Sequence, residues 1–221
     1  MRVKRSSICA VLVPLLVGCF GPAVPNDDLV RACRDEPAHW RNQTVMADTV
    51  LTADWVNLLA PPLRWTNTVG VQPGYNPCAA CTSLLLRGFS SVEYLPTSAS
   101  SLDRVWRYTF ANDGDPRCQF NENRAAPINH PPAGRCLAVE RNVPRAARYA
   151  IALHNTDRND QGIDVWTYEL VDLNERSVVA RATELYQTGW ETMMYRCSDV
   201  SVERSEAREF VEQSIRPNAV R

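Results

Sequence analysis

Lysine is almost absent from this sequence. The 221 residues include 24 basic side chains, but the only lysine is Lys4. If the first 18 residues are removed, the 24 basic residues less Arg2, Lys4 and Arg5 leave 21 arginines against 25 acids, a net charge of −4. Proteins that bind nucleic acid carry an excess of basic residues. We therefore expect no nucleic acid partner.

The short motifs of common hydrolases are also missing, because Gly-x-Ser-x-Gly, Ser-x-x-Lys and His-Glu-x-x-His do not occur. There are only three histidines, and none is placed by a motif. Carboxylate pairs occur in segments with turn composition, where a solvated turn is expected rather than a glycosidase pair: Asp113 with Asp115, and Asp157 with Asp160. We assign no catalytic residue, no metal and no cofactor, and favour a protein that is not an enzyme.

Only one hydrophobic run is present, and it is too short to cross a membrane. Residues Ile8 to Val17 would form a helix of about 15 Å, half the thickness of the hydrocarbon core. This run follows a positively charged start and contains Pro14. The pattern predicts a signal peptide over residues 1–18.

The run ends in Leu16-Val17-Gly18-Cys19, which resembles a bacterial lipobox. We expect cleavage before Cys19 and palmitate-type acylation of its thiol, which would hold the protein on a membrane, since two buried acyl chains suffice for stable anchoring. The alternative is an ordinary signal peptide with a chance cysteine. Phe20 after the cysteine resembles outer-membrane lipoproteins, so we expect an outer-membrane lipoprotein facing the periplasm. Residues 19–26 would form the lipidated tether and residues 27–221 one periplasmic globular domain.

Six cysteines remain after Cys19, and an even number in an exported chain indicates disulfides. They allow fifteen pairings, and the candidates are Cys33, Cys78, Cys81, Cys118, Cys136 and Cys197. Cys118 and Cys136 flank a loop rich in Pro, Asn and Gly, and a bridge there would be worth about 3 kcal/mol. This pairing is one of several that the sequence leaves open.

Cys78 and Cys81 form a Cys-x-x-Cys pair, which can serve redox exchange, metal binding or haem attachment. Haem attachment requires histidine at position 82, where the chain has Thr82. The turn-rich residues 72–77 predict no βαβ context and no helix N-terminus that would activate a thiol. A structural disulfide is the favoured interpretation, with redox activity and metal binding as alternatives.

Alternating patterns predict a mostly β domain. Expected strands cover residues 44–51, 83–95 with a bend at Arg87-Gly88, 104–110, 148–154, 163–171 and 178–185, with a hairpin turn at 172–176. Short helices are expected within 27–41, limited by Pro37, and 202–215, ended by Pro217. The predicted fold class is α+β: a mostly antiparallel sheet with peripheral short helices, stabilised by disulfides.

Several short strings between residues 70 and 199 carry a resemblance. They are Cys78-x-x-Cys81-x-x-Leu84-Leu85, Val92-Glu93-Tyr94, Asp115-Pro116-Arg117-Cys118, Arg148-Tyr149, Val171-Asp172-Leu173, Val178-Val179-Ala180 and Cys197. The pattern resembles a group of uncharacterised proteobacterial envelope lipoproteins. The resemblance implies export and structural cysteines but no activity. Where that group has glycine in the hairpin turn, this chain has Asn174-Glu175.

These features favour a membrane-anchored lipoprotein that binds a protein or glycan partner in the cell envelope without catalysis. The alternatives are an immunity lipoprotein against a secreted toxin, a structural component of an envelope complex, and a periplasmic thiol-redox enzyme. A toxin gene next to this one, a stable co-purifying complex, or free thiols at Cys78 and Cys81 would distinguish them.

Overall fold

The computed structural model describes most of the region predicted to be the globular domain. The described residues are 27–35, 39–54, 56–59, 64–65, 79–96, 99–118, 131–156, 163–188, 194–197 and 207–218. The predicted signal peptide, the tether with Cys19, and Cys78 lie outside these residues.

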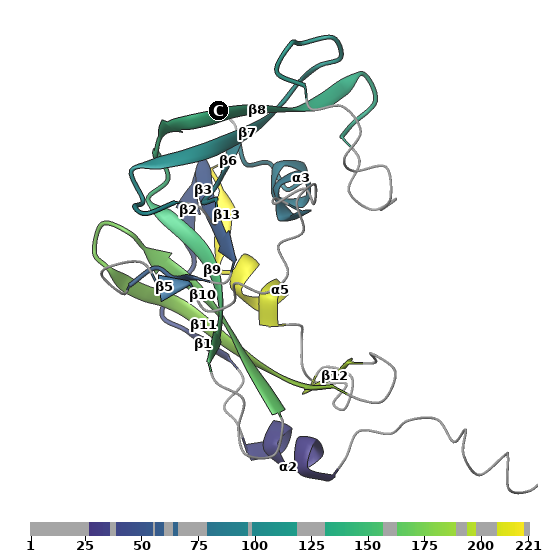
Figure 1. The fold of residues 1–221 in the computed structure, drawn as a ribbon, viewed down its shortest axis with the longest axis vertical. Coiled ribbons are helices and arrows are strands. Elements are labelled where there is room, and N and C mark those ends of the chain that lie inside the picture. Colours follow the sequence, from purple (N-terminus) through teal and green to yellow (C-terminus); the bar gives the residue numbers. More distant parts are fainter. Residues whose placement is uncertain are drawn as a thin grey trace, which may run out of the picture.

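A nine-stranded sheet forms the centre of the described fold (Figure 1). Its strands, in spatial order, are β1 (His39–Arg41), β11 (Ser177–Thr188), β10 (Ile163–Asp172), β9 (Tyr149–Thr156), β3 (Thr49–Asp54), β6 (Ser91–Tyr94), β7 (Arg104–Asn112) and β8 (Arg135–Pro144), and β12 (Met194–Arg196) also pairs with β11. All pairs are antiparallel except that β3 runs parallel to both β9 and β6. The predicted α+β class with a mostly antiparallel sheet is confirmed.

Two small sheets and three helices complete the described structure. β2 (Val45–Ala47) pairs in parallel with β13 (Ile215–Pro217), and β4 (Val56–Asn57) pairs antiparallel with β5 (Arg64–Trp65). The helices are α2 (Asp27–Asp35), α3 (Ala79–Leu86) and α5 (Ala207–Glu212). Figure 1 shows α3 and α5 on the same side of the main sheet.

The predicted hairpin at residues 172–176 is present between β10 and β11. Oδ1 of Asp172 accepts hydrogen bonds from the backbone N–H groups of Asn174, at 3.0 Å, and Glu175, at 3.2 Å. Arg176 adopts a left-handed φ of 52°, a conformation usually taken by glycine. The turn forms without glycine because the Asp172 carboxylate holds its backbone donors.

The strand predicted over residues 83–95 is present only in its second half, and the prediction was wrong for the first half. Residues 79–86 form α3, and only residues 91–94 form a strand, β6. Gly88 ends the helix with a φ of 106°, while its N–H donates to the Leu85 carbonyl at 3.0 Å. The three consecutive leucines fit either a buried strand or a buried helix, and the glycine cap was the signal for the helix.

Two further boundaries differ from the sequence prediction. The strand expected over residues 44–51 divides at Asp48 into β2 and β3, which belong to different sheets. The helix expected over 202–215 is α5, limited among the described residues to 207–212, and Pro217 lies within strand β13. Proline has no backbone N–H to donate. It is tolerated there because β13 belongs to a two-stranded sheet, in which each strand has one edge that needs no hydrogen-bond donor.

Both faces of the main sheet are covered. The larger core cluster joins the sheet to α3, α5 and β13 and includes Leu84, Ile151, Leu170, Val211 and Ile215. The opposite face packs against β4, with Leu51, Val56, Ala150 and Leu95 among the buried residues. A third cluster joins α2 to the ends of β10 and β11. This packing places the ends of α3 and α5 beside β13.

Candidate functional site

Two disulfides join pairs of described residues, one across the chain and one within a short loop. Cys33 in α2 is bonded to Cys197 after β12, across a sequence separation of 164 residues, and their Cα atoms lie 5.3 Å apart. Cys118 is bonded to Cys136 in β8, which confirms the pairing suggested by the Pro-rich loop. Four of the six candidate cysteines therefore have structural roles.

The Cys-x-x-Cys segment lies in a different setting from the one predicted. Because α3 begins at Ala79, Cys81 lies in the first turn of a helix, so the expectation that no helix N-terminus is present was wrong. Cys81 is disulfide-bonded and has no exposed surface. Thiol exchange requires access to the sulfur. The structural role of Cys81 is thus supported by its burial and not, as the sequence suggested, by the absence of a helix N-terminus.

Glu93 in β6 is a fully buried carboxylate that joins two parts of the sheet. Its Oε1 atom accepts from Nη2 of Arg107 at 2.7 Å and from Nε at 3.1 Å. Its Oε2 atom accepts from the backbone N–H of Ala147 at 3.0 Å, and both carboxylate oxygens lie within 3.1 Å of the Ala146 nitrogen. Both carboxylate oxygens are thus occupied, by Arg107 of β7 and by the segment before β9, so Glu93 is a structural residue.

A second buried carboxylate, Glu169, lies between His154 and Arg181 on three adjacent strands. Nη2 of Arg181 is 2.6 Å from its Oε1 atom, and Nε2 of His154 is 3.3 Å from its Oε2 atom. Nε2 of His154 makes no hydrogen bond of good geometry, so this contact is an ion pair only when the histidine is protonated. Burial raises the pKa of Glu169, but His154 and Arg181 outweigh it and hold this pKa below the usual value.

Glu169 should make stability depend on acidity. Because its folded-state pKa is depressed, the free energy of unfolding should fall as the pH drops below about 4.5, the ordinary value for a glutamate. Glu169→Gln should remove this component of the pH dependence. Urea unfolding between neutral and acid pH measures it, with Glu140→Gln, an exposed carboxylate, as the control. Parallel pH profiles for the wild type and Glu169→Gln would contradict the assignment.

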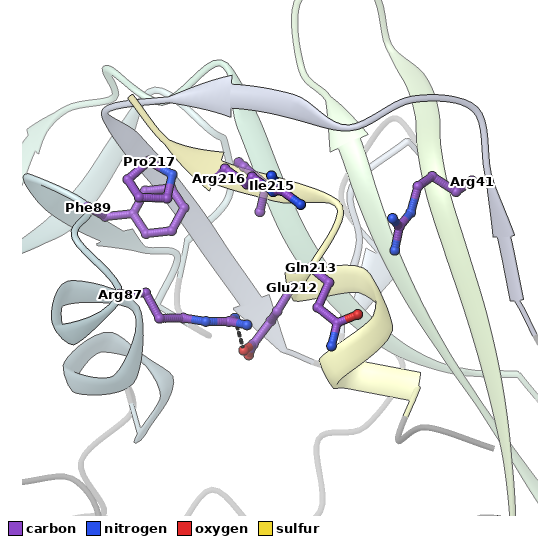
Figure 2. A pocket seen from close by; sticks show the side chains of 8 residues that line it. All are labelled: Arg41, Arg87, Phe89, Glu212, Gln213, Ile215, Arg216 and Pro217. Carbon is purple, nitrogen blue, oxygen red and sulfur yellow. Dashed lines mark hydrogen bonds and ion pairs between the residues drawn. The ribbon is translucent and has the colours of Figure 1, made fainter. Parts of the chain in front are cut away.

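A pocket of about 360 Å³ opens where the ends of α3 and α5 meet β13, and we call it the α3–α5 pocket. Figure 2 shows the side chains that line it: Arg41 from β1, Arg87 and Phe89 after α3, Glu212 and Gln213 at the end of α5, and Ile215, Arg216 and Pro217 of β13. These residues come from three segments that are far apart in the sequence: position 41, positions 87–89 and positions 212–217. None was identified as a site residue from the sequence, and no local motif marks them.

The charges of the α3–α5 pocket are unbalanced. Arg87 donates to Oε2 of Glu212 at 2.6 Å, and Arg208 donates to the other oxygen of Glu212 at 3.0 Å. Among the described residues, no carboxylate forms an ion pair with Arg41 or Arg216. The single carboxylate of the pocket is therefore already paired with two arginines, and the guanidinium groups of Arg41 and Arg216 have no carboxylate partner among the described residues.

The position of Arg41 is fixed by Phe210 of α5. Its guanidinium carbon lies 4.6 Å from the centre of the Phe210 ring, and Nη2 is 3.4 Å from the Phe210 carbonyl oxygen. The same ring stacks on His39, with the ring centres 4.5 Å apart. A cation held over an aromatic ring keeps its charge and its unused N–H donors. Arg41 is thus positioned at the pocket without being neutralised.

The described residues contain no group of three or more His, Cys, Asp or Glu side chains placed to hold a metal ion. None of the helices in this part of the chain has the length and apolar character that crossing a bilayer requires. No protein family model, curated protein or solved structure matches this chain.

Proposed function

We propose that this protein is a lipid-anchored component of the bacterial cell envelope that binds a partner without catalysing a reaction. The α3–α5 pocket carries the proposal for binding. No Ser, Thr, Cys, His, Lys or Tyr side chain lines it, so it offers no nucleophile, and its one carboxylate is held by two arginines. Guanidinium groups above an apolar floor are suited to recognition rather than to bond breaking.

The proposed location in the cell depends on the first 26 residues. The charged start, the short apolar run and Leu16-Val17-Gly18-Cys19 support cleavage and acylation at Cys19. Phe20 supports the outer membrane, with the domain in the periplasm. The disulfides support an oxidising compartment, because such bonds are rare in the reducing cytosol.

Replacement of Cys19 by alanine should abolish membrane anchoring. Cys19→Ala is expected to yield an unprocessed precursor or a form that stays in the aqueous phase, whereas the wild type enters the detergent phase and incorporates labelled palmitate. Cys9→Ala is the matched control, because Cys9 lies in the segment expected to be removed. Acyl labelling of Cys19→Ala at the wild-type level would refute the lipid anchor.

Partner binding can be tested in the cell with a photo-crosslinking amino acid. Leu86 precedes Arg87 at the pocket and its side chain is exposed, so a crosslinker there should capture a partner in the envelope. The same crosslinker at Arg104, an exposed position on β7, is the control. Equal labelling at the two positions would argue against a binding site at the α3–α5 pocket.

A further inference from the structure

We infer that the α3–α5 pocket binds an acidic segment of a protein partner, with carboxylates paired to Arg41 and Arg216 and apolar side chains on the floor between them. This inference rests on the proposed binding function and specifies the chemistry that the partner presents.

The charge of the pocket favours an anionic ligand. Arg41, Arg87 and Arg216 line the pocket with one carboxylate, Glu212, which Arg208 also contacts, although the whole chain has a net charge of −1. Two other carboxylates lie near the pocket and have local partners: Glu209 accepts from the Gln213 side chain, and Asp48 accepts from Asn218. Guanidinium groups bind carboxylates through paired, charge-assisted hydrogen bonds. The local excess of positive charge is therefore complementary to acidic side chains.

Apolar groups lie beside these arginines. Phe89, Ile215 and Pro217 line the pocket, and the first two are buried in the core. Two of the exposed large hydrophobic side chains also neighbour pocket arginines: Leu86, which is 48% exposed and precedes Arg87, and Met46, which is 51% exposed and is the register partner of Arg216. Exposed methionine and arginine are enriched at protein interfaces. A ligand that carries only charged groups would leave this apolar surface exposed to water, so we expect the ligand to carry apolar groups as well.

The arrangement of the arginines favours an extended chain over a single phosphate. In Figure 2, Arg87 points toward Glu212. Arg41, which belongs to strand β1, lies on the other side of Gln213. The free guanidinium groups therefore come from separate elements, β1 and β13, rather than from one cluster. A polypeptide that alternates acidic and apolar side chains can reach both positions and cover the floor.

The test uses the full chain as purified from the expressing cells. A short fluorescent peptide that alternates glutamate and leucine, separated by serines, should bind, and its affinity should fall as salt is added. Loss of a hydrogen bond to a charged group costs about tenfold or more in affinity. Arg41→Ala and Arg216→Ala should therefore each weaken binding about tenfold, while Arg31→Ala, an exposed arginine of α2, should leave it unchanged.

Three results would overturn the inference. The first is equal binding of a peptide with glutamine in place of glutamate, which would show that charge is not recognised. The second is equal binding of a peptide with serine in place of leucine, which would remove the role of the floor. The third is binding of phosphatidylglycerol vesicles, lost in Arg41→Ala, without peptide binding, which would assign the pocket to a lipid headgroup.

Crosslinking in the cell separates failure of this inference from failure of the proposed function. If the partner captured from position 86 is still captured in the Arg41→Ala, Arg216→Ala double variant, the protein binds a partner but the acidic-segment inference is wrong. If the peptide binds as expected but nothing is captured in the envelope, the pocket chemistry is supported and the proposed cellular function fails.

Discussion

Replacement of both Cys33 and Cys197 by alanine is expected to lower the free energy of unfolding by about 5 kcal/mol. The bond joins residues separated by 164 positions, so its removal frees most of the chain that follows α2. In the chain-entropy model, a loop of this length constrains the unfolded state by roughly that amount. The cluster of Leu29, Ile163 and Leu185 around the bond should also loosen.

The shorter disulfide provides a matched comparison. Cys118 and Cys136 are separated by 18 residues, so their joint replacement by alanine should cost about 3 kcal/mol. Urea unfolding of the wild type and both double variants measures the difference. A strong reductant opens the disulfides of the wild type, so in its presence the wild type should no longer be more stable than either variant. If the Cys33, Cys197 variant loses less stability than the Cys118, Cys136 variant, loop length does not govern the contribution of these bonds.

Replacement of Glu93 by alanine is expected to cost about 3–5 kcal/mol, the usual cost of removing one partner of a buried ion pair. The change would leave the buried face of Arg107 and the N–H groups of Ala146 and Ala147 without their acceptor. Glu93→Gln keeps the shape and one acceptor oxygen, so it should cost less. Hydrogen exchange at Ala146 and Ala147 should accelerate in both variants, because their N–H groups lose the carboxylate.

Glu140 offers the control for Glu93. It is also paired with an arginine, Arg117, at 2.6 Å, but both side chains are exposed. Exposed ion pairs contribute little to stability because water screens them, so Glu140→Ala should change the unfolding midpoint only slightly. Equal losses of stability in Glu93→Ala and Glu140→Ala would mean that the buried ion pair of Glu93 contributes no more to stability than the exposed pair of Glu140.

Much of the sheet could be predicted from the sequence alone. The strands over 104–110, 148–154, 163–171 and 178–185 are all present, because side-chain alternation is a local property of an extended chain. The turn at 172–176 was predictable for the same reason, since Asp172 and the residues after it determine its hydrogen bonds. The lipid anchor at Cys19 also depends on contiguous residues, and it stays a prediction.

The helix at residues 79–86 shows where local pattern was insufficient. A short apolar run buries its side chains equally well as a helix or as a strand, so the packing of Leu84 and Leu85 against the sheet decided the outcome. The parallel pairing of β3 with β6 and β9 likewise had no local signal. Strand direction depends on how the connections run, which is a property of the whole chain.

Residues that are far apart in the sequence meet only in the tertiary structure. The sequence determined that the cysteines should be oxidised, but only the fold selected Cys197 as the partner of Cys33. The sequence placed Glu169 on a strand, and only the sheet brought His154 and Arg181 to it. The same holds for Arg41 and Arg216 at the α3–α5 pocket, because ion pairs and pockets depend on distances in space, which sequence spacing does not specify.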